Sequence, residues 1–546
     1  MSDAERFKLV VLGIDGASWK LLDILMNKGR MPKLKEIVER SAYGTLESIV
    51  PPVTGPAWPA MATGLNPGRV GAFDFYNRRS VDELELYPVR ADQISGMAYW
   101  DLLSARGFRI GILNYPMLLP CYPLNGWMVA GIGAGFLQEW AFPEHFQKEL
   151  LSLDPPYEFI VPYASDMYAN NTDLLLRDYT NLLKARLAAL NHLIKRSPVD
   201  ILVPVISVSD FISHTMWHWW DEDHPHFSRD EADDRMEKLG EIWEMLDGLI
   251  DDLSRKLDDG GHLMIVSDHG FGPNYGVFHI NTWLEENGFL VRKNLKITGW
   301  SNKLKGKLIQ LFGVKLEPFL KKLQGSKAHL LLRPSVKREI DLYKTQALAL
   351  ETTDVFGMVF LNQQYFKKLS GGQAENLENT KKIISKGLVQ FGMENNLSIK
   401  VMDPAEIYHG EKTALSPEII FSVDDGRVSV SHYFGESVFE KKLFHPIKTG
   451  NHRMEGVFIG FGPGFVPGQL SDRPNLLDIA PTVYHLLGEA IPLGLDGDVM
   501  LSTLNENFQK VRYLDKQIEE FKHDDDGGSQ EDDEMIKERL KELGYL

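Results

Sequence analysis

The chain has 546 residues, 43% of them hydrophobic, which is enough for one large domain with a smaller satellite. Its formal net charge of −17 argues against a general nucleic-acid binder. The single cysteine, Cys121, excludes an internal disulfide and a zinc site built from thiolates, so any metal site must use Asp, Glu and His.

The N-terminus has charged residues where a signal peptide needs its apolar region, and the sequence contains no apolar run of about 18 residues. We therefore expect a cytoplasmic protein.

Apolar runs alternate with helical patterns along the chain. The first run, 8–16, leads into a helical pattern over 19–39, and similar runs recur at 200–210, 262–270 and 456–462, with a long helical pattern over 172–196. This order predicts an α/β fold with a mostly parallel central sheet, helices on both faces and a smaller cap or insert. Ligands collect at the carboxyl ends of such strands, and three of the four runs finish on an aspartate: Asp15, Asp210 and Asp268.

The stretch "PPVTGPAWPAMATG", residues 51–64, surrounds Thr54 with prolines. Pro56 suits the first turn of a helix, so we expect a helix over 57–63 that starts directly after Thr54. A threonine at a helix N-terminus either caps the helix or presents a hydroxyl that can attack a phosphate.

Two segments have strongly biased charge. Residues 291–345 hold 14 Lys and Arg against 3 acidic residues, a net charge of +11, with apolar residues at helical spacing. This basic amphipathic insert could be a lid on the core, or could contact an anionic membrane or an anionic substrate. Residues 523–534 hold seven acidic residues, a composition that predicts a flexible linker to a short C-terminal amphipathic helix.

Potential metal ligands fall into two sets. Asp210 and His214 are four residues apart, so on a helix they share one face about 5–6 Å apart. His218 continues that face, with a core role as the alternative, and the third ligand is expected to be His452, with His445 competing. Asp15, Asp268 and His269 lie at strand ends beside Thr54, where an aspartate can also simply cap a helix. Such ligands suit Zn²⁺, Mn²⁺ or a similar ion.

Two ions about 3.5–4 Å apart would clamp the attacking and leaving oxygens of a phosphoryl displacement. A coordinated ion lowers the pKa of a bound hydroxyl by many units, so Thr54 could act as a nucleophile without a separate general base.

Six motifs occur in an order that resembles the alkaline phosphatase superfamily, in particular its type I phosphodiesterase/nucleotide pyrophosphatase branch and predicted cytosolic phosphohydrolase or phosphomutase relatives. The motifs are "GIDG", "PPVTGPAWPAMATG", "SDFISH", "SDHG", "TGNHRMEG" and "NLLDIAPTVYHLLG…LDGDVM", within roughly residues 8–500. The resemblance implies one metal site of Asp15, Asp268 and His269 with Thr54 as ligand and nucleophile, and another of Asp210, His214 and His452. Two divalent ions are expected, Zn²⁺ before Mn²⁺.

The sequence also departs from the branch. The pyrophosphatases have an asparagine about 21 residues after the nucleophile, and Phe75 stands there. Either Asn77 or a backbone N–H substitutes for it, or the substrate is placed differently. Sulfatases of the superfamily need a cysteine or serine that is modified to formylglycine, with proline and arginine close behind it. This chain has Thr54 and Trp58 in that region, so a sulfatase is excluded. A phosphomutase shares the metals but attacks with serine.

We therefore expect a two-metal hydrolase of phosphodiester or nucleotide pyrophosphate bonds, acting on a small phosphorylated substrate and not on a specific nucleic acid. The alternatives are a phosphomonoesterase or phosphomutase of the same superfamily, and an inactive scaffold that binds a membrane or partner. The catalytic core is expected over 1–290 and 346–505, the basic insert over 291–345, and the acidic linker and C-terminal helix over 506–546. Few cations and many aromatic residues near the motifs favour a diester over a monoester.

Overall fold

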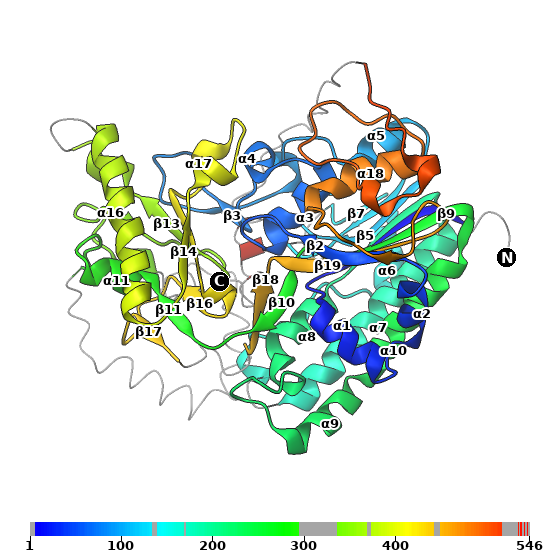
Figure 1. Cartoon of the computed structure of the whole chain (residues 1–546), viewed down its shortest axis with the longest axis horizontal. Helices are drawn as coiled ribbons and strands as arrows, with labels where there is room; N and C mark the ends of the chain where they lie inside the picture. The colour runs from blue at the N-terminus through cyan, green and yellow to red at the C-terminus, as the bar shows by residue number, and fades with distance from the viewer. Residues whose placement is uncertain are drawn as a thin grey trace.

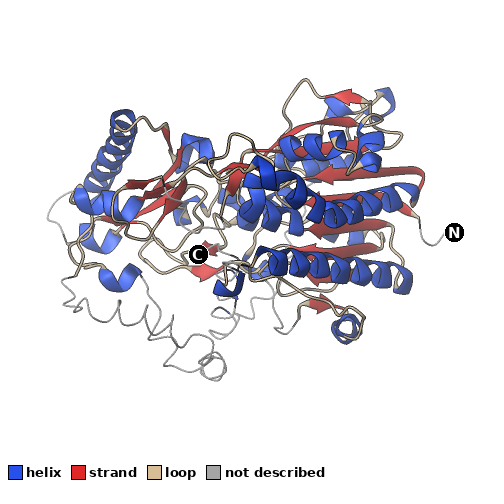
Figure 2. Ribbon diagram, turned by 90° about the horizontal axis from the view of Figure 1, so that it is seen from below, coloured by secondary structure: helices blue, strands red, loops and turns tan. Residues whose placement is uncertain are grey.

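The computed structural model describes residues 6–133, 139–168, 171–293, 336–368, 373–441 and 448–515, together with Asp533, Ile536, Lys537, Leu540 and Leu543. Two bodies of different size lie side by side in it (Figures 1 and 2). The larger body is built on one long sheet, and the smaller body contains short strands and the helix α16 (Gln373–Glu394).

The larger body contains a nine-stranded sheet whose central strands run parallel, as predicted. Its order is β20 (Gly468–Gln469), β2 (Ala42–Glu47), β19 (Glu455–Phe461), β9 (Leu257–Val266), β1 (Phe7–Ile14), β8 (Ile201–Ile206), β5 (Ile110–Tyr115), β6 (Gly126–Ala130) and β7 (Ala141–Phe142). Strand β1 pairs in parallel with β8 and β9, whereas β19 is antiparallel to both of its neighbours. Every residue of β8 is buried, as expected for a strand covered on both faces.

Helices cover both faces of this sheet (Figure 1). One group contains α1 (Trp19–Asn27), α2 (Pro32–Val38), α7 (Thr172–Arg196), α8 (Val208–Met216), α9 (Arg229–Lys238) and α10 (Gly240–Arg255). The other contains α3 (Thr54–Thr63), α4 (Pro67–Val70), α5 (Tyr99–Ala105) and α18 (Ile479–Leu486), while α6 (His145–Leu151) follows β7. The predicted helix over 172–196 has those bounds, but the pattern over 19–39 forms two helices, because Pro32 starts a new one.

The smaller body is formed by chain that leaves the large sheet after β9. It holds the sheet β12 (Ala347–Leu348), β13 (Gly357–Leu361), β15 (Ile419–Val423), β14 (Ile399–Met402), and a three-stranded sheet of β16 (Ser429–Ser431), β11 (Val277–His279), β17 (Phe439–Glu440). Its helices are α11 (Ile280–Glu286), α14 (Val336–Glu339), α15 (Gln363–Phe366), α16 and α17 (Pro404–Ile407). The chain then returns through β18 (Gly450–Arg453), which pairs with β10 (Gly270–Pro273).

The predicted boundaries of the insert fall inside this smaller body. Residues 294–335 lie outside the described ranges, so the basic lid and its membrane contact stay predictions. Of the C-terminal segment, Ile536, Leu540 and Leu543 are buried against the body, and Lys537 pairs with Glu351 at 2.9 Å.

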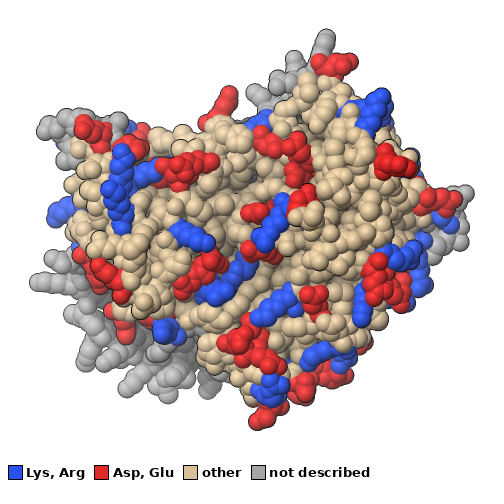
Figure 3. Space-filling view, viewed as in Figure 1, with Lys and Arg blue, Asp and Glu red and all other residues tan. Residues whose placement is uncertain are grey.

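Charges of both signs are interspersed over the face of the molecule drawn in Figure 3, and its described residues form no continuous basic surface there. Among the described residues no helix combines the length and apolar character needed to cross a membrane.

Candidate active site

The structure brings all seven predicted site residues into one cluster at the carboxyl ends of β1, β8 and β9. Each of them is at most 1% exposed. Asp15 follows β1 directly, Asp268 and His269 follow β9, Asp210 and His214 lie on α8, Thr54 opens α3, and His452 lies on β18. Asp210 was expected at a strand end, but β8 ends at Ile206 and Asp210 lies in the first turn of the helix that follows.

The first ligand group consists of Asp210, His214 and His452, whose candidate ligand atoms lie within 4.8 Å of one another. Asp210 Oδ1 is 3.5 Å from His214 Nε2 and 3.3 Å from His452 Nε2. The two Nε2 atoms are 2.9 Å apart. The one-turn spacing of Asp210 and His214 on a helix, which the sequence predicted, therefore contributes two members of the group.

The backbone fixes which nitrogen of each ring carries hydrogen. His214 Nδ1 lies 3.2 Å from the Gly450 carbonyl oxygen, and His452 Nδ1 lies 2.8 Å from that of Pro52. A carbonyl oxygen only accepts, so each Nδ1 donates and each Nε2 keeps its lone pair. Two lone pairs that face each other call for a cation between them, as in the metal sites where histidines are oriented in this way.

The second ligand group consists of Asp15, Asp210 and His269. His269 Nε2 lies 3.6 Å from Asp15 Oδ1, 4.0 Å from Asp210 Oδ1 and 3.3 Å from Asp268 Oδ2. His269 Nδ1 faces the Gly270 carbonyl at 3.1 Å, which again leaves Nε2 as the acceptor. Asp210 thus belongs to both groups and lies between them, although the resemblance implied that it serves one site only.

Burial has opposite effects on the acids and the histidines. It raises the pKa of Asp268 to about 7 and that of Asp15 well above its usual value, the latter raised further by the Asp268 and Asp210 carboxylates. It lowers the pKa of His452 to about 3 and those of His214 and His269 well below the usual value. Neutral imidazoles and carboxylates gathered in one buried cluster match the donor set that a first-row divalent ion prefers.

Two oxygens in the cluster support this fit. Within the described ranges, Asp15 Oδ2 and Asp268 Oδ2 are buried without a hydrogen-bond donor, while Asp268 Oδ1 accepts from Gly16 N at 3.2 Å. An unsatisfied buried carboxylate oxygen is costly, and coordination to a cation removes that cost.

Thr54 is the first residue of α3, three residues earlier than the predicted start of the helix. Val53 is the N-cap residue, so the capping role considered for Thr54 is wrong. Its hydroxyl oxygen instead lies 3.2 Å from His269 Nε2 and 3.4 Å from Asp15 Oδ1. The positive end of the α3 dipole is located at this hydroxyl, which favours an anion there.

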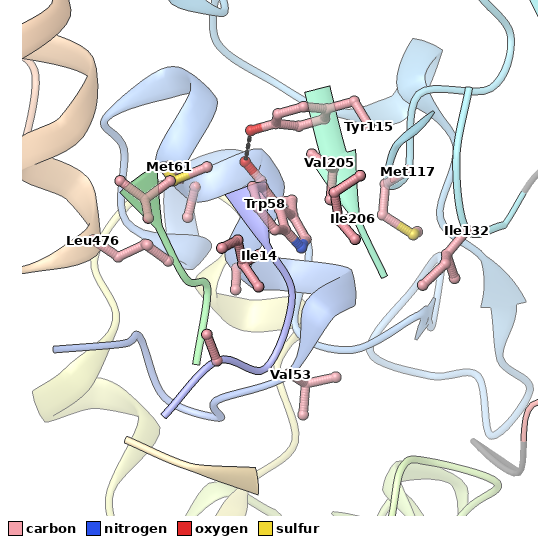
Figure 4. Close-up of a cluster of buried hydrophobic side chains, with 14 of the residues drawn as sticks. Ile14, Val53, Trp58, Met61, Tyr115, Met117, Ile132, Val205, Ile206 and Leu476 are labelled. Carbon is pink, nitrogen blue, oxygen red and sulfur yellow. Dashed lines mark hydrogen bonds between the residues drawn. The ribbon is translucent and has the colours of Figure 1, made fainter. Parts of the chain in front are cut away.

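A hydrophobic cluster supports the two residues that lead into the site (Figure 4). Ile14 precedes Asp15 and lies beside Trp58 on α3, and Val53, which precedes Thr54, belongs to the same cluster. The Trp58 carbonyl accepts a hydrogen bond from Tyr115 of β5 at 2.8 Å. This packing fixes the start of α3 relative to the end of β1.

Two glycines allow the close approaches that the site needs. Gly16 has φ +64°, and a Cβ there would lie 2.8 Å from the Phe271 ring, which packs against His214, His269 and His452. A Cβ on Gly450 would lie 2.2 Å from the Ser213 carbonyl oxygen. Gly450 therefore lets β18 approach α8 closely enough for His452 to meet His214.

Other candidates from the sequence lie away from the ligand atoms. Asn77 accepts from Phe73 N at 3.1 Å and donates to the Gly71 carbonyl, so its side chain is engaged in its own turn. His218 contacts Thr449 Oγ1 at 3.0 Å and is not in either ligand group. His445 lies outside the described residues.

The aromatic residues near the motifs, for which a core position and a position at the mouth of the site were both open, are core residues. All seven are at most 6% exposed: Trp58, Phe73, Phe75, Tyr76, Trp217, Trp219 and Trp220. They give no support to a stacking platform for the substrate.

The four arginines near the motifs have structural partners. Arg69 pairs with Asp496 at 2.9 Å, Arg79 pairs with Asp533 at 3.1 Å, and the guanidinium groups of Arg78 and Arg453 bind backbone carbonyls. The cation that the sequence reasoning missed is Lys448, which lies four residues before His452 and precedes β18. Its only sequence signal was its place in the segment "HPIKTGNHRMEG".

Comparisons with known proteins bear on the family and the fold of the chain. The family model described as type I phosphodiesterase/nucleotide pyrophosphatase matches residues 9–445. No curated protein matches the chain. Among solved structures, human ectonucleotide pyrophosphatase/phosphodiesterase 5 is 13% identical, covers 91% of this chain and 100% of its own, and has a TM-score of 0.51. The murine protein of that name is 14% identical, covers 90% and 97%, and has a TM-score of 0.48.

Proposed function

The chain belongs to the type I phosphodiesterase/nucleotide pyrophosphatase family, and from that premise we propose that it hydrolyses phosphodiester or nucleotide pyrophosphate bonds through a covalent threonine intermediate. The human structure of similar fold supports an alkaline-phosphatase-like architecture for the chain. The observation that carries the proposal is the position of the Thr54 hydroxyl, 3.2 Å from His269 Nε2 and 3.4 Å from Asp15 Oδ1 at the start of α3.

Two divalent ions are part of the proposal, Zn²⁺ first and Mn²⁺ second. Asp210, His214 and His452 would hold one ion, and Asp15, Asp268, His269 and Thr54 the other, with Asp210 between the two sites. Bound divalent ions supply Lewis-acid chemistry, which lowers the pKa of a hydroxyl and neutralises charge on a phosphoryl group. The histidines are oriented for this role by their Nδ1 contacts with backbone carbonyls.

The chain's own residues define the reaction. Thr54 Oγ1 attacks phosphorus, the bond from phosphorus to the leaving oxygen breaks, and the hydroxyl proton passes toward Asp15 Oδ1, the carboxylate oxygen within reach. Water then attacks phosphorus, the bond from phosphorus to Thr54 Oγ1 breaks, and a proton returns to Oγ1 as the phosphate or its remaining monoester leaves. The N-terminus of α3 stabilises the negative charge that the phosphoryl oxygens carry.

A substrate panel tests the proposal. The metal-loaded protein is assayed with bis(p-nitrophenyl) phosphate, p-nitrophenyl phosphate, a dinucleoside pyrophosphate and a sugar phosphate. We expect turnover of the aryl diester or the dinucleotide at a higher kcat/KM than the aryl monoester. A monoester preference of about tenfold, isomerisation of the sugar phosphate, or no turnover of any ester would contradict the proposal.

A further inference from the structure

Lys448 and Asp354 form an ion pair that joins the two bodies of the molecule beside the histidine ligands. Lys448 comes from the segment that returns to the large body through β18, and Asp354 lies between β12 and β13 of the smaller body. Both side chains are mostly buried, with exposed fractions of 13% and 24%. A pair with so little contact with water is weakly screened and keeps a defined geometry.

Hydrogen bonds hold the backbone of Lys448 and of the two residues that follow it next to the site. Its carbonyl accepts from Asn274 Nδ2 at 3.4 Å, and the N–H of Thr449 donates to the His214 carbonyl at 2.8 Å. The Gly450 carbonyl oxygen accepts a hydrogen bond from His214 Nδ1. The Lys448 ammonium group therefore extends from a segment whose next two residues, Thr449 and Gly450, are hydrogen-bonded to the ligand residue His214.

Asp354 is held just as firmly from the other body. Its carbonyl accepts from Val430 N at 2.8 Å. The preceding residue, Thr353, donates its N–H and its hydroxyl to Asp74 Oδ2 at 3.0 and 2.7 Å. Asp74 in turn lies beside the first turn of α3, because a Cβ on Gly55 would be 3.0 Å from the Asp74 carbonyl carbon.

The charges of this pair reach the ligand histidines. Burial lowers the pKa of His214, and the Lys448 ammonium lowers it further. Burial lowers the pKa of His452 to about 3. The Lys448 ammonium also lowers this pKa, and the Asp354 carboxylate raises it. The Lys448 ammonium therefore lies within electrostatic range of the His214 and His452 rings, and the Asp354 carboxylate within range of the His452 ring.

The charge of a phosphate ester separates the two substrate classes. A diester carries one negative charge on its phosphoryl group, and a monoester carries up to two at neutral pH. An enzyme that favours the monoester usually provides an additional cation for the extra charge. The arginines near the motifs are engaged elsewhere, whereas the Lys448 ammonium acts on two of the ligand histidines and Asp354 cancels its charge.

We propose that the Lys448–Asp354 ion pair sets the charge preference of the site: while Asp354 neutralises Lys448, the site selects the singly charged diester over the doubly charged monoester. The inference rests on the proposed hydrolase function and names the pair that determines its substrate class. In this proposal Lys448 supplies the positive charge that the phosphoryl oxygens experience, and Asp354 limits that charge.

Two variants with opposite expected effects test the pair. Asp354→Asn keeps the shape of the side chain and frees the ammonium, so the ratio of kcat/KM for p-nitrophenyl phosphate to that for bis(p-nitrophenyl) phosphate should rise about tenfold. Lys448→Gln leaves Asp354 as an unbalanced negative charge and should lower the same ratio below that of the wild type.

Binding of inorganic phosphate gives a readout that needs no turnover. Calorimetry on zinc-loaded protein should show tighter phosphate binding to Asp354→Asn and weaker binding to Lys448→Gln. Metal content and melting temperature are measured on each variant. Asp403→Asn is the matched control, because it breaks the Lys381–Asp403 pair of 2.7 Å in the smaller body and retains a helix-capping side chain.

The inference is overturned if Asp354→Asn, with wild-type metal content, leaves the ratio and phosphate binding unchanged, or if both variants shift them in the same direction. If Asp354→Asn does not fold, an unchanged ratio in Lys448→Gln overturns it. Failure of the proposed function looks different: the wild type would hydrolyse neither ester, while phosphate binding would still report on the pair.

Discussion

His214 Nε2 and His452 Nε2 lie 2.9 Å apart, and the other nitrogen of each ring donates to a backbone carbonyl. Neither ring can give the other a hydrogen without breaking its carbonyl contact. Both rings are almost completely buried, so water cannot easily separate the two lone pairs. A divalent ion bound by Asp210 and both histidines would convert this repulsion into coordination.

Loss of one of these histidines should remove metal and stability together. We expect His452→Ala to lower the metal content of the purified protein, measured by inductively coupled plasma mass spectrometry, by about one equivalent. The melting temperature of this variant should respond less to added Zn²⁺ than that of the wild type.

The comparison variant is His445→Ala, since His445 was the competing ligand. It should retain the wild-type metal content. Metal loss in His445→Ala with none in His452→Ala would reverse the assignment.

Thr54→Ala should fold, bind metal and lose about three or more decades of kcat/KM for an aryl diester, because the attacking oxygen is gone. Thr54→Ser should keep measurable activity. Thr63→Ala, at the other end of α3, removes a hydroxyl that donates to the Pro59 carbonyl and should keep near wild-type activity. A Thr54→Ala protein with wild-type rates would exclude the covalent route.

Metal affinity should depend on pH through the acids and not through the histidines. In the metal-free protein burial raises the pKa of Asp268 to about 7 and that of Asp15 well above its usual value, so an incoming ion must displace protons from them. The lowered pKa values of His214, His269 and His452 leave these rings neutral in the same range. Competition with a fluorescent chelator should show affinity falling below pH 7 by up to about tenfold per pH unit for each proton displaced. Constant affinity between pH 6 and 8 would argue against proton displacement.

Asp101, away from the site, should make the fold less stable as pH rises. Burial raises its pKa to about 7, although Tyr122 and the Ala98 N–H donate to its carboxylate. Between about pH 4 and 7 the folded state holds a proton that the unfolded state has released, so stability falls by up to about 1.4 kcal/mol per pH unit. Melting temperatures should show a shallower decline for Asp101→Asn. An identical slope in both proteins would contradict the shift.

Much of the site could be predicted from local sequence rules. The carboxyl ends of parallel strands lie at one edge of a sheet, which brought Asp15 and Asp268 together, and the one-turn spacing placed Asp210 and His214 on one helical face. The ordered motifs then identified His452.

Other features depend on contacts between distant segments. The position of Asp210 between both ligand groups follows from how α8 packs against β18, and no spacing in the sequence encodes it. The Lys448–Asp354 pair joins residues 94 positions apart. The small sheets of the smaller body are made of strands of two to five residues, too short for a clear periodic pattern.

The most direct test of the account is a titration of metal-free wild type and Thr54→Ala with Zn²⁺, with metal uptake and bis(p-nitrophenyl) phosphate hydrolysis followed on the same samples. The account predicts that both proteins take up two equivalents and that only the wild type gains activity, which levels off at the second equivalent. A wild type that binds two equivalents and hydrolyses no diester, or that reaches full activity without metal, would contradict it.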